Sequence, residues 1–154
     1  MPSEIERKFL VDRLPAELDD EAGDEIEQGY LAIGDDEIRV RRRGDAHVLT
    51  VKRGSGLARD EVEIPLTREA FGELWPLTAG RRVEKTRLMT PVEGETAEVD
   101  VYRGALAGLL TVEVEFADAE AAGAFSPPRW FGSEVTGDPK YSNQALAVDG
   151  VPMR

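Results

Sequence analysis

Residues 1–12 read MPSEIERKFLVD, and within this stretch two acids and a lysine stand two positions apart. Glu4, Glu6 and Lys8 alternate with neighbours that include the apolar Ile5 and Phe9. Successive side chains of a β-strand point to opposite faces of its sheet. The stretch therefore predicts a strand with one charged face and one largely apolar face.

The same alternation recurs along the chain, and turn residues such as Gly34-Asp35 and Gly44-Asp45 separate the alternating segments. The eight predicted strands span residues 3–11, 25–32, 36–43, 46–53, 59–65, 81–89, 96–103 and 109–116. Strands joined by short turn-rich connections favour an antiparallel sheet or barrel.

Three further segments have helical spacing, and two of them begin at a residue that can cap a helix. They span residues 67–75, 118–124 and 142–148, with Thr67 and Ser142 as the expected capping residues. The acidic segment 14–24 is expected to be mobile and solvated. No repeat or linker divides the chain, so residues 1–154 are expected to form a single domain.

The composition excludes several classes of function. No uninterrupted apolar run approaches the roughly 20 residues that span a bilayer, and the first residues lack the features of a signal peptide. A cytoplasmic protein that does not insert into membranes is therefore expected. The formal net charge of −12 argues against a nucleic-acid partner, because surfaces that bind nucleic acid need a basic patch.

Metal chemistry is limited to oxygen ligands. The chain has no cysteine and a single histidine, His47, so thiolate zinc sites, thiol nucleophiles and His-His metal cages are all excluded. His47 itself is expected to be a structural or surface residue. Any bound metal should then be a hard cation such as Mg²⁺ or Mn²⁺.

Sorting the predicted strands by parity gathers most of their charged side chains on one face. The acids on this face are Glu4, Glu6, Glu61, Glu63, Glu98, Asp100, Glu113 and Glu115. The bases are Lys8, Arg39, Arg41, Arg43, Lys52, Lys85 and Arg87. The face is nearly neutral although the whole chain carries −12, and entire strands on it are either acidic or basic. Both features are unusual for a solvated sheet face.

Closing eight strands into a barrel would turn this face into the lining of a tunnel, since such a barrel can hold one small ligand. Burying so many charges is costly unless they are paired, hydrated or coordinating something. Carboxylates two residues apart on a strand lie about 6 to 7 Å apart, which suits one or two divalent cations. Arg and Lys side chains match phosphate. The face thus indicates a metal-bound polyphosphate, and a solvated face with salt bridges of about 0 to 1 kcal/mol each is the alternative.

A series of motifs, in order along nearly the whole chain, resembles the CYTH domain family, whose members are also called triphosphate tunnel metalloenzymes. The motifs are Glu4-Ile5-Glu6-Arg7-Lys8, Gln28-Gly29-Tyr30-Leu31, Ile38-Arg39-Val40-Arg41, Leu49-Thr50-Val51-Lys52-Arg53, Glu61-Val62-Glu63, Lys85-Thr86-Arg87, Glu98-Val99-Asp100, Glu113-Val114-Glu115-Phe116 and the segment 134–143. An acidic-x-acidic-x-Lys motif alone is a weak signal, but the ordered series is specific.

The resemblance implies a mainly β (α+β) fold: an eight-stranded antiparallel closed β-barrel, the triphosphate tunnel, with a few outer helices and segment 142–148 as a C-terminal plug helix. It implies a hydrolase, an inorganic triphosphatase that cleaves inorganic triphosphate (tripolyphosphate) to pyrophosphate and phosphate with Mg²⁺ or Mn²⁺. The alternatives are a thiamine triphosphatase, a class IV adenylyl cyclase and a non-enzymatic sensor that binds polyphosphate or nucleotide. Small barrels often associate, so a monomer and a homodimer both remain possible.

The same resemblance assigns roles to residues of the charged face. The expected metal ligands are Glu4, Glu6, Glu61, Glu63, Asp100, Glu113 and Glu115. The expected phosphate-binding residues are Lys8, Arg39, Arg41, Lys52, Lys85, Arg87 and Lys140. Two cations per site are expected, and Glu113 and Glu115 should hold the one that activates the attacking water. With Lys8 they are the expected catalytic residues.

Four other residues have less defined expectations. Glu98 and Arg43 share the charged face, where each is either a site residue or a salt-bridge residue at the rim. Tyr30 is expected either near the tunnel mouth or in a packing role. Arg53 has the opposite parity and should lie outside.

Overall fold

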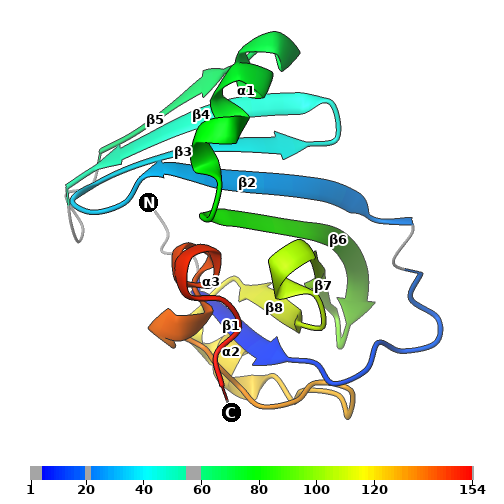
Figure 1. The fold of residues 1–154 in the computed structure, drawn as a ribbon. Helices are drawn as coiled ribbons and strands as arrows, with labels where there is room; N and C mark the ends of the chain where they lie inside the picture. Colours follow the sequence, from blue (N-terminus) through cyan, green and yellow to red (C-terminus); the bar gives the residue numbers. More distant parts are fainter. Residues whose placement is uncertain (1–4, 20–21, 55–59, 154) are drawn as a thin grey trace.

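The computed structural model describes residues 5–19, 22–54 and 60–153, and its main feature is an eight-stranded antiparallel sheet (Figure 1). The strands are β1 (Ile5–Leu10), β2 (Asp24–Ala32), β3 (Asp36–Arg43), β4 (Ala46–Arg53), β5 (Asp60–Pro65), β6 (Arg82–Val92), β7 (Glu95–Arg103) and β8 (Leu110–Phe116). Their order in the sheet is β1-β8-β7-β6-β2-β3-β4-β5. The prediction of eight antiparallel strands is confirmed.

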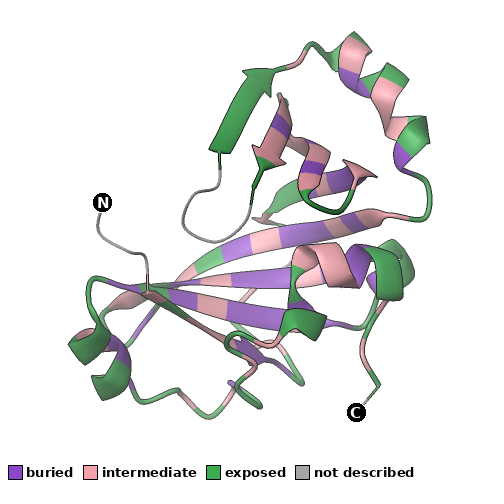
Figure 2. Cartoon of the chain, turned by 90° about the vertical axis from the view of Figure 1, so that its left-hand side faces the viewer, coloured by how far each residue is buried: buried purple, intermediate pink, exposed green. Residues whose placement is uncertain are grey.

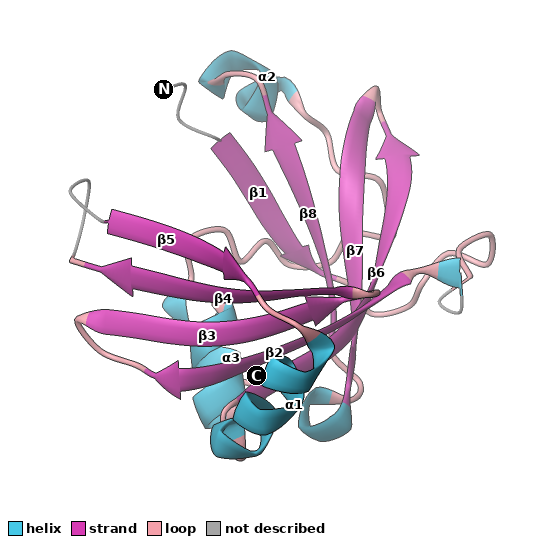
Figure 3. Ribbon diagram, turned by 90° about the horizontal axis from the view of Figure 1, so that it is seen from above, coloured by secondary structure: helices cyan, strands magenta, loops and turns pink. Residues whose placement is uncertain are grey.

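The sheet curves strongly, so that its two edge strands, β1 and β5, lie on the same side of the molecule (Figure 3). Its concave side is called the inner face below, and its convex side the outer face. Among the described residues no hydrogen-bonded ladder joins β1 to β5. Closure of the barrel therefore stays a prediction.

Three short helices lie outside or at one end of the sheet, and each begins where its sequence supplies a cap. The helices are α1 (Arg68–Leu74), α2 (Ala119–Ala124) and α3 (Asn143–Asp149). The side chains of Thr67, Asp118 and Ser142 each accept a hydrogen bond from the backbone N–H three residues further on. These bonds satisfy one of the free donors of each first turn, and the predicted caps Thr67 and Ser142 are confirmed.

The larger apolar core lies on the outer face of β1, β6, β7 and β8. Phe9, Val99, Val112 and Val114 are almost completely buried there. They pack against α2 and against Phe131 in the segment that follows it. Figure 2 shows how the buried positions concentrate in this half of the molecule.

A second core closes one end of the inner face. Tyr30, Val83 and Tyr102 continue the inner-face positions of their strands and are at most 3% exposed. They pack with Tyr141 and with Leu146 of α3. The plug helix and the packing role of Tyr30 are thus confirmed.

The predicted strand 81–89 is longer than expected, because β6 continues through Pro91 to Val92 and the chain reverses at Glu93 and Gly94, both of which have positive φ. β6 pairs with β2 only as far as Arg87, so among the described residues no ladder continues on that side for Pro91 to break.

The expected solvated segment 14–24 also contributes to the core. Leu14 and Leu18 are partly buried against the outer core, whereas Glu17 and Asp19 between and beside them are exposed. Within the described part of this segment, Leu14 and Leu18 are therefore the exceptions to the expected solvation.

None of the described helices covers the outer face of β5. Val62 is 54% exposed and Ile64 47% exposed, and β5 is exposed along its whole length (Figure 2). α1 instead lies over β3 and β4. No described helix is long and apolar enough to cross a membrane.

Candidate active site

The pairing register places the predicted charged residues together on the inner face, because directly paired residues of antiparallel strands share a face. Lys8 of β1 lies opposite Glu113 of β8, which in turn lies opposite Glu98 of β7. The remaining inner-face pairs include Glu6 with Glu115, Arg87 with Asp100, Thr50 with Arg39 and with Glu63, and Lys52 with Glu61. The parity argument is confirmed for the described residues, and Glu4 lies outside them.

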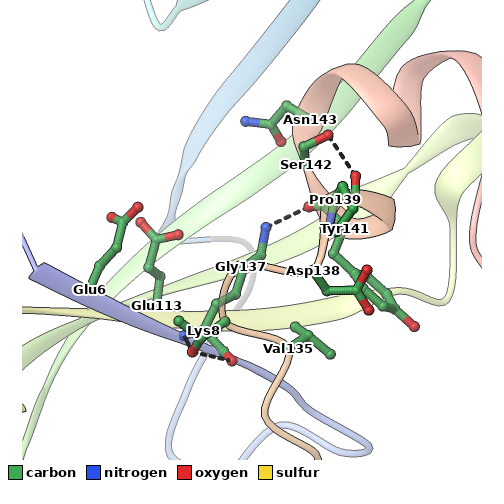
Figure 4. A pocket seen from close by; sticks show the side chains of 11 residues that line it. Glu6, Lys8, Glu113, Val135, Gly137, Asp138, Pro139, Tyr141, Ser142 and Asn143 are labelled. Carbon is green, nitrogen blue, oxygen red and sulfur yellow. Dashed lines mark hydrogen bonds between the residues drawn. The ribbon is translucent and has the colours of Figure 1, made fainter. Parts of the chain in front are cut away.

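A cavity of about 330 Å³ lies beside the charged inner-face residues of β1 and β8 (Figure 4). Glu6, Lys8 and Glu113 form its sheet side, and the segment 135–143 forms the opposite wall. The Lys8 ammonium donates a hydrogen bond of 2.8 Å to the carbonyl oxygen of Tyr141. Burial lowers the pKa of Lys8, although the nearby carboxylates of Glu113, Asp100 and Glu6 oppose that effect.

Glu6 and Glu113 form a pair of like charges at this cavity, and Figure 4 shows their carboxyl groups side by side. Burial, followed by the hydrogen bond and the charge of Glu6, raises the pKa of Glu113 to about 7. Two adjacent carboxylates cannot both ionise freely. The pair is therefore a place where a cation would be stabilised.

A compact ion-pair cluster follows on β6 and β7. The Asp100 carboxylate accepts from Lys85 at 2.9 Å and from two nitrogens of Arg87 at 2.9 and 3.1 Å. Burial raises the pKa of Asp100, but its two basic partners outweigh burial and lower it. Burial lowers the pKa of Lys85. For Arg87, the bonds to Asp100 and the charge of that residue outweigh burial and raise the pKa.

The basic residues of β3 crowd the other side of the inner face. Burial lowers the pKa of Arg41, and repulsion from Arg39, Arg87 and Arg43 lowers it further. The Nε atom of Arg39 is buried and has no hydrogen-bond partner among the described residues. Guanidinium groups that repel one another and keep a free donor indicate a site for an anion with several oxygens.

Comparison with known proteins identifies the family of the chain. No protein-family model matches the chain. An inorganic triphosphatase from Nitrosomonas europaea is 47% identical over 150 residues, which cover 95% of this chain and 97% of that protein. The chain belongs to the triphosphate tunnel metalloenzyme family.

Two further proteins support this membership in the triphosphate tunnel family. An inorganic triphosphatase from Acetivibrio thermocellus is 38% identical over 149 residues, 95% of this chain and 94% of that protein. A crystal structure of an inorganic triphosphatase superposes with a TM-score of 0.84 at 45% identity and covers 96% of each chain. The resemblance found in the motifs is thus confirmed.

The structure does not bring all predicted residues of the tunnel to one place. Glu61 and Glu63 lie on the inner face but are exposed on the edge strand β5. Lys140 is exposed on the 3₁₀ turn η5 (Pro139–Tyr141) and is not among the residues that line the cavity. Arg43 pairs with Asp24 at 3.0 Å, as a salt-bridge residue at the rim does.

The structure shows where two of the residues with less defined expectations lie, Arg53 and Glu98. Arg53 lies outside and pairs with Asp36 at 3.1 Å, as its parity predicts. Glu98 shares Arg87 with Asp100, but at a longer distance of 3.4 Å. This geometry places Glu98 in the ion-pair cluster of the inner face.

The sequence analysis missed three groups of the cavity wall. They are the Thr136 hydroxyl, the Tyr141 carbonyl and the Asn143 amide, whose oxygen lies 3.4 Å from the Lys85 ammonium. All three belong to the motif segment 134–143, which was the signal that could have identified them. Their roles depend on contacts across the sheet that local sequence does not specify.

The donor set at the cavity suits a hard cation, although it is incomplete in the described residues. No group of three or more Asp, Glu, His or Cys side chains within residues 5–19, 22–54 and 60–153 could hold a metal ion. Glu6 and Glu113 supply carboxylate oxygens, the ligands that Mg²⁺ and Mn²⁺ prefer. Glu4, the next acidic position of the same motif, lies outside the described residues. The residues present therefore fit such a cation through two donors.

Proposed function

We propose that this protein is a metal-dependent hydrolase that cleaves inorganic triphosphate to pyrophosphate and phosphate. The observation that carries the proposal is the crowding of Arg39, Arg41 and Arg87 on the same concave face as the carboxylate pair Glu6 and Glu113. A substrate that is both highly anionic and bound to cations satisfies both groups at once. The names of two relatives, at 47% and 38% identity, point to the same substrate.

In this proposal, the basic residues bind and orient the phosphates. Arg39, Arg41, Lys85 and Arg87 face the substrate with donors suited to phosphate oxygens. The Lys8 ammonium, held at the cavity by Tyr141, stabilises charge on the transferring or leaving group. Positioning of this kind supplies most of the catalysis in phosphoryl transfer.

The carboxylates form the other half of the proposed site. Glu6 and Glu113 would hold Mg²⁺ or Mn²⁺, with Glu115, opposite Glu6, as a further ligand. Bound there, the cations would neutralise phosphate charge and lower the pKa of the attacking water. The expected number of two cations stays a prediction, as do the oligomeric state and the lack of a nucleic-acid partner.

The placement of aromatic residues favours inorganic triphosphate over a thiamine or purine compound. The three tyrosines, Tyr30, Tyr102 and Tyr141, are between 1% and 6% exposed in the core at the plug end. The tryptophans and phenylalanines belong to the outer core or to the region of α1. None of these rings offers an open stacking surface at the cavity, which a thiazolium, pyrimidine or purine ring would need.

The direct test is to measure phosphate release from inorganic triphosphate, ATP and thiamine triphosphate, each with Mg²⁺, Mn²⁺ or EDTA. A Glu4→Gln/Glu6→Gln variant is assayed in parallel, with circular dichroism to confirm that it is folded. The proposal expects cleavage of inorganic triphosphate far faster than of ATP, with loss of activity in EDTA and in the variant.

The other outcomes contradict the proposal in distinct ways. Binding of triphosphate without turnover of any substrate would identify a sensor. Release of pyrophosphate from ATP without orthophosphate would identify a cyclase. Faster cleavage of thiamine triphosphate than of inorganic triphosphate would show that the argument from aromatic residues is wrong.

A further inference from the structure

A further set of contacts links the outer face of β1 to the cavity, and it includes Arg7 and Glu134, which have been given no role so far. The segment 132–136 runs along the edge of β1 that is not paired with β8. Leu10 donates to the carbonyl of Ser133 at 2.9 Å, and Val135 donates to the carbonyl of Lys8 at 2.8 Å. Glu134 thereby forms an isolated bridge with Phe9. These bonds bring Glu134 next to the outer-face side chain of Arg7.

Arg7 and Glu134 form a two-pronged ion pair although they are 127 residues apart in the sequence. The Arg7 guanidinium donates to the two carboxylate oxygens at 2.9 and 2.8 Å. It also donates to the backbone carbonyls of Ala122 and Phe125 at 2.8 and 3.2 Å. The hydrogen bonds from Arg7 and then from Thr136 lower the pKa of Glu134 to about 2.

Thr136 links the ion pair to the cavity by hydrogen bonds. The Thr136 hydroxyl donates to Glu134 at 2.6 Å and accepts from the backbone N–H of Lys8 at 2.9 Å. The same segment, at Tyr141, accepts the hydrogen bond from the Lys8 ammonium. Lys8 is therefore held at its backbone and at its charged end by one segment, and Arg7 and Glu134 fix where that segment lies.

We propose that Arg7 and Glu134 are positioning residues: from outside the tunnel they set the place of the Lys8 ammonium in the cavity. The inference rests on the proposed function, because it concerns the rate of that reaction. Stability alone gives little reason for the pair, since a partly exposed ion pair contributes about 0 to 1 kcal/mol. The two-pronged geometry adds a fixed orientation, which a simple charge pair does not provide.

The test compares Glu134→Gln with a control ion pair of similar exposure that touches no residue of the cavity. Arg7 and Glu134 have side chains 22% and 38% exposed. Arg42 and Glu27, on the outer face of β3 and β2, have side chains 24% and 30% exposed, which makes Glu27→Gln the matched control. kcat and KM for inorganic triphosphate are measured for both variants and for the wild-type protein, at a temperature where all are folded.

We expect kcat of Glu134→Gln to fall by about tenfold or more, because a displacement of about 1 Å in a catalytic group costs up to about a hundredfold in rate. KM should change by less than about threefold, since Arg39, Arg41, Lys85 and Arg87 still bind the phosphates. Glu27→Gln should leave both constants within about twofold of the wild type. Arg7→Lys should resemble Glu134→Gln, because lysine keeps the charge but loses the planar fork.

A double-mutant cycle with Lys8→Met separates positioning from a general structural effect. If Glu134 acts through Lys8, then Glu134→Gln causes no further loss of kcat once Lys8 has been replaced. An equal fractional loss in both backgrounds would overturn the proposal, as would a kcat for Glu134→Gln within about twofold of that for Glu27→Gln.

A folding defect cannot hide the answer. If Glu134→Gln does not fold, Thr136→Val is the second variant, because it removes the hydroxyl that joins Glu134 to the backbone of Lys8 and leaves the ion pair intact. It is expected to give the same loss of kcat and the same dependence on Lys8. Failure of the proposed function would show itself separately, as a wild-type protein that does not hydrolyse inorganic triphosphate.

Discussion

Asp100 is the residue whose loss should cost the most stability at the inner face. Its side chain is 9% exposed and is the shared partner of Lys85, which is 5% exposed, and of Arg87, which is 17% exposed. Asp100→Asn keeps the shape of the side chain but removes the carboxylate charge that both bases contact at about 3 Å. Among the described residues, Lys85 then loses its ion-pair partner, and Arg87 keeps only the more distant Glu98 at 3.4 Å.

Removing one partner of a buried ion pair typically costs about 3 to 5 kcal/mol, because the remaining charge stays buried. For a chain of this size, about 1 kcal/mol shifts the melting temperature by about 2 to 4 °C. Asp100→Asn should therefore lower the melting temperature by about 6 to 20 °C. Lys85 has a pKa already lowered by burial, so at alkaline pH it loses its proton more readily in the variant and the loss of stability shrinks.

The assay measures the free energy of unfolding by urea titration, monitored by circular dichroism, in EDTA and without phosphate. Glu98→Gln is the matched control, because Glu98 lies on the same strand and contacts the same Arg87 but at 3.4 Å and with 31% exposure. That variant should lose about 1 kcal/mol or less. If Asp100→Asn lost no more than Glu98→Gln, the inner face would be far better hydrated than its burial indicates, and the reasoning would be refuted.

Three further predictions follow from the same geometry. Because the pKa of Glu113 is raised to about 7, the free energy of unfolding of the metal-free protein should fall as pH rises from about 4.5 to 7. Glu113→Gln should make the free energy of unfolding less dependent on pH in this range. Titration calorimetry near pH 7 should show proton release on Mg²⁺ binding. Asn143→Ala removes an amide from the cavity wall, so KM for triphosphate should rise about two- to tenfold in steady-state kinetics, the worth of one hydrogen bond. Gly29→Ala would place a Cβ 2.5 Å from the Thr78 hydroxyl oxygen and should cost about 1 to 3 kcal/mol in urea unfolding, whereas Gly72→Ala on α1 meets nothing within 4 Å and should not destabilise.

Much of the inner face could be predicted because the side-chain period of a strand is two. Parity alone assigned Lys8, Glu113 and Asp100 to one face, and the observed register agrees. The helix caps Thr67 and Ser142 were likewise local features, decided within one turn of chain. The face predicted a metal-bound polyphosphate, and the family resemblance that the ordered motifs carry predicted the triphosphatase.

Pairing between distant strands could not be predicted in the same way. β2 pairs with β6, and β1 with β8, although the intervening segments give no local signal for either partner. Tyr30 and Val83 are apolar positions within the charged inner face, and their burial is explained only by α3, which packs there. The ion pair of Arg7 and Glu134 could not be predicted for the same reason, because the two residues are 127 positions apart in the sequence.

The inner face is arranged at the expense of its own stability. Like charges lie directly opposite each other in the pairs Glu6 with Glu115 and Glu98 with Glu113, an arrangement that destabilises a sheet. Burial lowers the pKa of Arg41 and raises that of Glu113, and like-charged neighbours add to both shifts, so both signs of charge are unfavourably placed in one concavity. Opposite charges do face each other in other pairs, such as Lys8 with Glu113 and Arg87 with Asp100, but a face selected for stability alone would also separate the like charges. Placing like charges together is advantageous only if a cation relieves the acids and an anion relieves the bases, and a metal-bound triphosphate does both.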